Sequence, residues 1–201
     1  MKIEVFSDMV CPWCYIGKRR LRSALERLGE PADVVWRSFQ LDPDYPGGVR
    51  WTLPEAHLNR YGVSRAENDR RLAMVTALAA REGLEYRLDR ALVANTFDAH
   101  RLVHHAATRG AADDVVDRLM RAYAVEGRWI GDPATLAAIA SEAGLPALPP
   151  GAAYAADVAA DLARARELGV TGVPTVVIDG GYGLAGPDTD ELIRAITACR
   201  T

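Results

Sequence analysis

The chain has 201 residues, of which 49% are hydrophobic and 25% are charged, a composition typical of a globular protein that buries a sizeable core. The formal net charge is only −3 and the two signs are interspersed, which argues against a nucleic-acid-binding face or an acidic tail. The longest apolar stretches fall well short of the roughly 18 residues of a membrane span, and the N-terminus lacks the apolar segment of a signal peptide. We therefore expect a cytoplasmic protein without nucleic-acid or membrane partners.

The first 41 residues have the pattern of a β-α-β unit. Residues 3–7 alternate apolar and polar side chains, as a strand does, and residues 15–28 repeat apolar side chains at helical spacing. A Gly-Glu-Pro run at 29–31 ends the helix. Residues 33–41 are rich in β-branched and aromatic side chains, which predicts a second strand.

Helices dominate the rest of the chain until its end returns to β structure. After a Pro- and Gly-rich break at 42–53, the periodicity predicts helices near 54–61, 64–82, 95–109, 111–126, 132–143 and, past a second break, 152–168. The end predicts strands at 175–178 and 182–185 around an Asp-Gly-Gly turn, and a helix at 189–199. In that helix Cys199 shares a face with Leu192 and Ile196, which favours packing.

Two of the three cysteines form the sequence Cys11-Pro12-Trp13-Cys14 between the first strand and the first helix. If Cys11 caps the helix, its sulfur lies near the backbone N–H groups of Trp13 and Cys14, and this field favours the thiolate, the nucleophile of disulfide exchange. Pro12 then takes the first helical position, where its missing N–H is no loss. Cys14, one turn along and more shielded, is placed to attack a mixed disulfide on Cys11 and release the partner.

Metal and nucleotide sites are weaker interpretations. A Cys-x-x-Cys pair is also half of a zinc site, but no second pair exists and Cys199 lies far along the chain. His100 and His104 stand four apart on a predicted helix without a third ligand pattern, so packing or surface histidines are favoured. Residues 181–186 fit G-x-G-x-x-G, but too little chain follows for a dinucleotide-binding unit. We expect no metal site.

Two other features have two interpretations each. Asp8, just before the cysteine motif, is placed either to take or relay the proton of the second cysteine or to cap its loop by accepting from backbone N–H groups. Residues 95–102 either line the active-site cleft or form a helix N-terminus with Leu102 and Val103 facing a core.

A further motif, Gly172-Val173-Pro174-Thr175, stands where the late strand begins, a position at which proline is tolerated. Together with the earlier motifs it resembles the thioredoxin superfamily and, within it, the DsbA-like, FrnE-type branch, over essentially the whole chain. The three matching blocks are residues 7–17 (Ser-Asp-Met-Val-Cys-Pro-Trp-Cys-Tyr-Ile-Gly), 95–102 (Asn-Thr-Phe-Asp-Ala-His-Arg-Leu) and 172–175.

The resemblance implies an α/β thioredoxin fold with a helical domain inserted after the second strand: residues 1–44 and 151–201 would form the thioredoxin-like core, and residues 45–150 the insertion. It also implies a cis bond before Pro174, packed against the cysteine pair, and pairing of the Val173 backbone with a substrate strand. The expected catalytic residues are Cys11, Cys14 and Pro174, and the expected substrate-binding residues are Pro12, Trp13, Val173 and Asn95.

The expected function is that of a thiol–disulfide oxidoreductase that oxidises, reduces or isomerises disulfides of a protein or small-molecule substrate. It would need no cofactor; glutathione as redox partner and a homodimer are left open. The alternative is a glutathione-dependent isomerase or transferase of the 2-hydroxychromene-2-carboxylate isomerase or kappa-class type. Such relatives resemble the chain in architecture but typically carry serine where Cys11 stands, so retention of both cysteines favours redox chemistry. A non-catalytic module that docks through the inserted helices is a third hypothesis.

Overall fold

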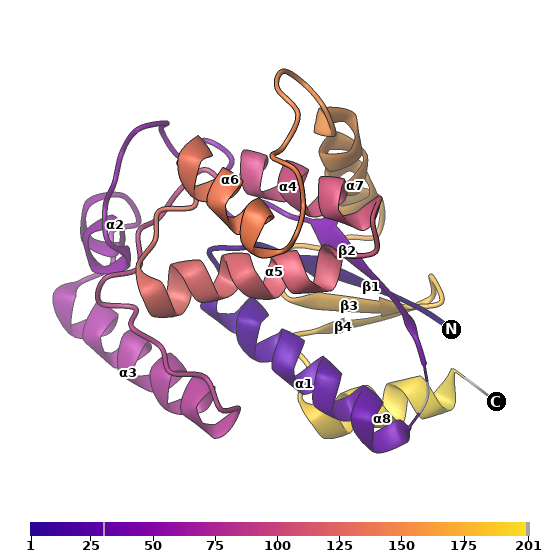
Figure 1. Ribbon diagram of the computed structural model, residues 1–201. Helices are drawn as coiled ribbons and strands as arrows, with labels where there is room; N and C mark the ends of the chain where they lie inside the picture. The colour runs from indigo at the N-terminus through magenta and orange to yellow at the C-terminus, as the bar shows by residue number, and fades with distance from the viewer. Residues whose placement is uncertain (30, 200–201) are drawn as a thin grey trace.

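A four-stranded sheet forms the centre of the protein in the computed structural model, which describes residues 1–29 and 31–199 (Figure 1). The strand order is β2-β1-β3-β4. Strand β1 pairs in parallel with β2 and antiparallel with β3, and β3 and β4 form a hairpin. The strands are β1 (Lys2–Ser7), β2 (Asp33–Ser38), β3 (Thr175–Ile178) and β4 (Tyr182–Ala185). This is the α/β thioredoxin arrangement that the resemblance implied.

Helices cover both faces of the sheet. Helices α1 (Pro12–Leu28) and α8 (Thr189–Ala198) pack together on one face, and α7 (Ala155–Glu167) packs over β2 on the other (Figure 1). Between β2 and α7 the chain forms α2 (Leu53–Asn59), α3 (Arg65–Arg81), α4 (Phe97–Ala107), α5 (Ala112–Arg121) and α6 (Pro133–Glu142). Each helix of the sequence prediction is therefore present.

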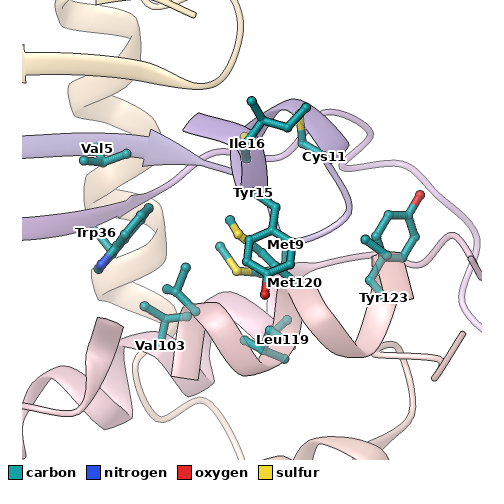
Figure 2. Close-up of a cluster of buried hydrophobic side chains, with 14 of the residues drawn as sticks. Val5, Met9, Cys11, Tyr15, Ile16, Trp36, Val103, Leu119, Met120 and Tyr123 are labelled. Carbon is teal, nitrogen blue, oxygen red and sulfur yellow. The ribbon is translucent and has the colours of Figure 1, made fainter. Parts of the chain in front are cut away.

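One apolar cluster joins the sheet to the helices that follow β2. Val5 and Trp36 from the strands pack in the same cluster as Tyr15 of α1, Val103 of α4 and Leu119 of α5 (Figure 2). Helices α4 and α5 therefore contribute side chains to the same core as the sheet and do not form a separate core. The division of the chain into a core and an insertion at residues 45 and 150 stays a prediction.

Several boundaries differ from the sequence prediction. The first helix begins at Pro12, as the cysteine motif predicted, although its apolar repeat starts only at Tyr15. Strand β2 ends at Ser38 instead of 41. The helix expected to run to residue 126 changes at Ala122 into a π-helical segment, η1 (Ala122–Glu126). Glu30, placed in the break after the first helix, lies outside the described residues.

Cys199 corrects a packing prediction. It forms the C-cap of α8 and its side chain is exposed, whereas Leu192 and Ile196 are buried. The Cys199 backbone still follows the helix (φ −73°, ψ −3°, with its N–H donating to the Ala195 carbonyl at 3.1 Å), so the helical spacing is kept but the packed core stops at Ile196. In the part of the chain that the structure describes, no helix is long and apolar enough to cross a membrane.

Candidate active site

The two cysteines of the motif lie at the N-terminus of α1, as the sequence predicted. Cys11 is the N-cap, with extended backbone angles (φ −92°, ψ 113°), and Pro12 takes the first helical turn. The N–H of Cys14 donates to the carbonyl of Cys11 at 3.1 Å, which closes that turn. The Cys11 sulfur does not accept the expected capping hydrogen bond among the described residues; its thiol instead donates to the Val173 carbonyl at 3.7 Å.

Both cysteines are buried: 4% of Cys11 is exposed, and Cys14 is almost completely enclosed, with 1% of its surface exposed. Burial raises the pKa of the Cys14 thiol well above its ordinary value, and the Cys11 sulfur raises it further. Contacts with Ser7 and with the backbone of Asp8 oppose this rise without overcoming it. Cys14 therefore remains a thiol at neutral pH.

The second motif meets the first directly. The Val173–Pro174 peptide bond is cis, and Pro174 is buried next to α1. The contact is close because α1 has no side chain there: a β-carbon added to Gly17 would lie 2.9 Å from Pro174 Cγ. The Pro174 carbonyl accepts from the N–H of Gly186 at 2.8 Å, which ties the segment to the end of the hairpin.

A pocket of about 500 Å³ opens beside Cys11. Its walls come from the cysteine motif, the Val173 segment, and helices α2 and α3, and they are mainly apolar. The lining residues are Val10, Cys11, Pro12, Trp13, Leu41, Asp42, Leu53, His57, Tyr61, Arg71, Leu72, Met74, Val75, Val93, Ala94, Tyr123 and Val173. The expected substrate-binding residues Pro12, Trp13 and Val173 thus lie on one pocket wall, and Trp13 is 38% exposed.

The polar side chains at the pocket rim already have partners. Asp42 accepts from Arg60 and Tyr61, Arg71 pairs with Glu67 at 2.7 Å, and His57 Nδ1 lies 2.8 Å from Asn68 Oδ1. Each of these charges thus has an opposite charge beside it, although Arg71 shares Glu67 with Arg70, and the interior of the pocket is apolar.

Two tyrosines near the cysteines were not predicted from the sequence. The Tyr86 hydroxyl donates to the Pro12 carbonyl at 2.5 Å and so holds the start of α1. Tyr123, in the π-helical segment, reaches the pocket wall near Cys11. Burial raises the pKa of both hydroxyls, and the negative charge of Cys11 adds to the effect. No spacing pattern marks either residue, because both come from segments distant in the sequence.

Asp8 is buried, and its contacts support the capping interpretation. Its Oδ2 accepts from the N–H of Leu41 at 2.8 Å, so it does cap backbone, although in the segment after β2 rather than in its own loop. Its Oδ1 has no hydrogen-bond partner among the described residues and lies 3.5 Å from Nε2 of His100. A role in proton transfer from Cys14 stays a prediction.

Asn95 follows Val93 and Ala94, which line the pocket, but is not itself among the described residues that line it. Its amide donates to the Pro43 carbonyl at 2.8 Å, and its oxygen accepts from Gln40 at 3.2 Å. It therefore links the segment after β2 to the start of α4, and a substrate contact by Asn95 stays a prediction. Leu102 and Val103 of α4 are buried, in agreement with the interpretation of this stretch as a helix facing a core.

His100 and His104 have different partners. His100 Nε2 lies 3.0 Å from the Phe39 carbonyl, whereas His104 Nε2 lies 3.1 Å from Ser38 Oγ and 3.0 Å from Asp161 Oδ2. Within residues 1–29 and 31–199, no group of three or more His, Cys, Asp or Glu side chains is arranged to hold a metal.

Comparison with known proteins supports the fold over its whole length. A probable DsbA oxidoreductase from Streptomyces coelicolor has a crystal structure similar to this one, with a TM-score of 0.92 and 36% identity over 100% of this chain and 90% of that chain. A 2-hydroxychromene-2-carboxylate isomerase shares the fold at 16% identity (TM-score 0.71; 100% and 95% covered). The uncharacterized protein YwbO of Bacillus subtilis is 26% identical over 198 residues, 94% of this chain and 93% of YwbO.

The family model of the DSBA-like thioredoxin domain matches residues 2–196, nearly the entire chain. This match includes the cysteine motif, the helices that follow β2 and the Val173–Pro174 segment. The chain belongs to the DsbA-like thioredoxin-domain family of thiol–disulfide oxidoreductases.

Proposed function

We propose that the protein exchanges electrons with disulfides through Cys11 as attacking and Cys14 as resolving residue. The observation that supports this most directly is the different access of two buried sulfurs in one helical turn: Cys11 (4% exposed) lines the pocket, whereas Cys14 (1% exposed) is not among the described residues that line it. An incoming disulfide reaches Cys11 first. The helix N-terminus favours negative charge on that sulfur.

In the reducing direction, the Cys11 thiolate attacks one sulfur of the substrate disulfide. A Cys11–substrate bond forms, the substrate bond breaks, and one substrate thiolate leaves. Cys14 then attacks the Cys11 sulfur, giving the Cys11–Cys14 disulfide and a second substrate thiolate, while the Cys14 proton passes to a departing thiolate. The substrate gains two electrons and the protein loses two; oxidation of a dithiol is the reverse.

The interactions that keep Cys14 protonated change during the reaction, and the change favours its ionisation when it must attack the mixed disulfide. Burial and the charge of Cys11 both raise the pKa of the Cys14 thiol. When Cys11 enters a mixed disulfide its charge is lost, so this part of the rise disappears. Cys14 then ionises more readily when its attack is needed.

Substrate alignment is assigned to the residues around the two sulfurs. The Val173 backbone, 3.7 Å from the Cys11 sulfur through its carbonyl, is proposed to pair with an extended substrate segment. Trp13 and Pro12 would contact the substrate at the pocket rim, and Asn95 would act indirectly through the segment that it anchors. The direction of the reaction, glutathione as redox partner, a homodimer and a cytoplasmic location stay predictions.

Trapping of mixed disulfides tests the proposal. Cys14→Ser should accumulate covalent adducts with disulfide-bearing proteins, because Cys11 still attacks the substrate disulfide and the serine hydroxyl does not resolve the mixed disulfide. Cys11→Ser should trap far less. In an isomerase that activates glutathione, Cys14 has no step, so Cys14→Ser would keep turnover and trap no protein. Adducts on non-reducing gels that are equal for both variants, or absent from both, would contradict the dithiol mechanism.

A further inference from the structure

The π-helical segment η1 places a buried tyrosine in the wall of the apolar pocket. A π turn contains an extra residue, and such turns occur often at functional sites. Here Tyr123, the second residue of η1, is 1% exposed and lines the pocket. In Figure 2 its hydroxyl points away from the packed side chains of Met9, Leu119 and Met120.

The Tyr123 hydroxyl is buried without a hydrogen-bond partner among the described residues. A buried hydroxyl that lacks a partner is unfavourable for folding, since it has given up its bonds to water. Because Tyr123 forms part of the pocket wall, a small shift of its side chain on binding would let a molecule in the pocket supply the missing partner. Because burial raises the pKa of Tyr123, the group stays protonated and acts as a donor at neutral pH.

The rest of the pocket limits what that molecule is. Its volume of about 500 Å³ lies within the range of small-molecule sites, and apolar side chains such as Leu53, Leu72 and Val75 form its interior. The charges at the rim, on Asp42 and Arg71, are already paired. An ammonium group would have to compete with Arg60 for Asp42, and a carboxylate would find Arg71 only at the exposed rim, where it shares Glu67 with Arg70, so the enclosed part of the pocket suits an apolar body.

We propose that the pocket selects small organic disulfides or thiols whose sulfur is attached to an apolar body bearing one hydrogen-bond acceptor, which the Tyr123 hydroxyl binds. This rests on the proposed dithiol chemistry, and Cys11 on the pocket wall brings the reacting sulfur to the same cavity. The step is the one written above: the protein is oxidised to the Cys11–Cys14 disulfide and the substrate is reduced to two thiols. Tyr123 is a specificity-determining residue.

Single-turnover reaction of the reduced protein with two reagents tests the proposal. Dithiodipyridine has neutral rings with a nitrogen acceptor, and dithiobis(nitrobenzoate) has anionic rings. The ratio of the rate constant for dithiodipyridine to that for dithiobis(nitrobenzoate) should be higher for the protein than for free mercaptoethanol. Tyr123→Phe should lower the rate constant for dithiodipyridine about three- to tenfold, as the loss of one hydrogen bond does, and leave dithiobis(nitrobenzoate) within about twofold.

Two other variants keep the test independent of folding. Met74 lines the pocket but is 52% exposed, so Met74→Lys should fold normally and speed dithiobis(nitrobenzoate) about two- to fivefold at low salt. Tyr154→Phe is the matched control: its hydroxyl contacts His105, away from the pocket, so both rate constants should stay unchanged. Tyr123→Phe should also keep or raise the urea midpoint, since the removed hydroxyl has no partner to lose.

The proposal is overturned if both Tyr123→Phe and Met74→Lys leave the preference between the two reagents unchanged. It is also overturned if Tyr123→Phe slows the reduction of insulin as much as that of dithiodipyridine, because the occupant is then an apolar protein side chain. The proposed attack by Cys11 is tested separately, by comparing the rates of wild type and Cys11→Ser. A wild-type protein that reacts no faster than its Cys11→Ser variant contradicts the proposed function, whatever the preference.

Discussion

Gly17 and Pro174 are in contact between α1 and the start of β3, with room for no side chain at position 17. The position of an added β-carbon, 2.9 Å from Cγ and 3.3 Å from Cβ of Pro174, is closer than packed carbon atoms come. Glycine inside a helix is about 1 kcal/mol less favourable than alanine. This unfavourable helix propensity of Gly17 is offset because the glycine lets the Val173–Pro174 segment approach the cysteine motif, with the Val173 carbonyl next to the Cys11 sulfur.

Gly17→Ala should therefore harm the site more than it helps the helix. We expect a net decrease of about 0–2 kcal/mol in the free energy of unfolding, since overpacking by one methyl outweighs the gain in helix propensity. Displacement of Pro174 should slow reaction with dithiobis(nitrobenzoate) about tenfold. Urea denaturation and stopped-flow measurements give the two values. Gly47→Ala, where an added β-carbon meets nothing within 4 Å, is the control. Unchanged kinetics in Gly17→Ala would show that the contact has no bearing on the site.

The raised pKa of Cys14 predicts a pH dependence of alkylation. In Cys11→Ser the charge at position 11 is gone, but burial, the largest cause of the rise, remains. Alkylation of Cys14 by iodoacetamide should therefore be slow at pH 7 and should still be increasing above pH 9. Mass spectrometry of the peptides follows Cys14 and the exposed Cys199 in the same sample. A Cys14 rate that levels off below pH 8 would contradict the raised pKa.

Local chemistry explains why much of the site was predictable. Cys11 and Pro12 have strong positional preferences at a helix start, and the structure places them at the N-cap and in the first turn. Asp132 and Pro133 likewise begin α6, and Gly127 ends η1 with a left-handed φ of 68°. In each case the signal and the structure that it determines lie within a few residues of each other.

The parts that could not be predicted depend on contacts between distant segments. Tyr86 meets Pro12 across 74 residues, and Gly17 meets Pro174 across the whole intervening chain. The π turn at Ala122–Glu126 has the residue pattern of an ordinary helix. Exposure of Cys199 depends on whether another segment covers the end of α8, which the spacing of residues within the helix does not reveal.

Cys199 should be a spectator in the redox reaction. Its side chain is exposed at the end of α8, and it is absent from the pocket that contains Cys11. Cys199→Ala should therefore change the single-turnover rate constant with dithiobis(nitrobenzoate) by less than about twofold, as is usual for a surface substitution away from the site. The measurement should count one fewer reactive thiol per protein. A tenfold loss of rate with an unchanged circular dichroism spectrum would instead indicate a third redox centre.

A buried ionic network holds the sheet to α7, on the face opposite the cysteines' helix. Glu4, 2% exposed on β1, accepts from Arg164 of α7 at 2.9 Å and from Arg37 of β2 at 2.7 Å. Arg37 also donates to Asp161 at 2.9 Å. Burial raises the pKa of both carboxyl groups, but the hydrogen bonds outweigh it: those from Arg164 and Arg37 lower the pKa of Glu4 below its ordinary value, and that from His104 lowers the pKa of Asp161.

This network predicts how stability depends on acid. A carboxyl group whose pKa is lower in the folded state stabilises the protein above its unfolded pKa, and the contribution is lost as pH falls through the folded value. The free energy of unfolding should therefore decline below about pH 4.5, the ordinary value for Glu4. Glu4→Gln should lower it at pH 7 by about 1–3 kcal/mol, since hydrogen bonds to a charged group are lost.

The informative quantity is how the difference in urea midpoint between wild type and E4Q changes with pH, not the decrease in stability at a single pH. Because the amide side chain of the E4Q variant does not titrate, the gap between wild type and E4Q in urea midpoint should narrow from pH 7 to pH 3.5. Glu67→Gln is the matched control: Glu67 pairs with Arg70 and Arg71 on the surface, where solvent screens the interaction, so its midpoint should follow wild type at every pH. A gap for E4Q that stays constant with pH would mean that Glu4 contributes by packing alone, and that its charge does not hold α7 to the sheet.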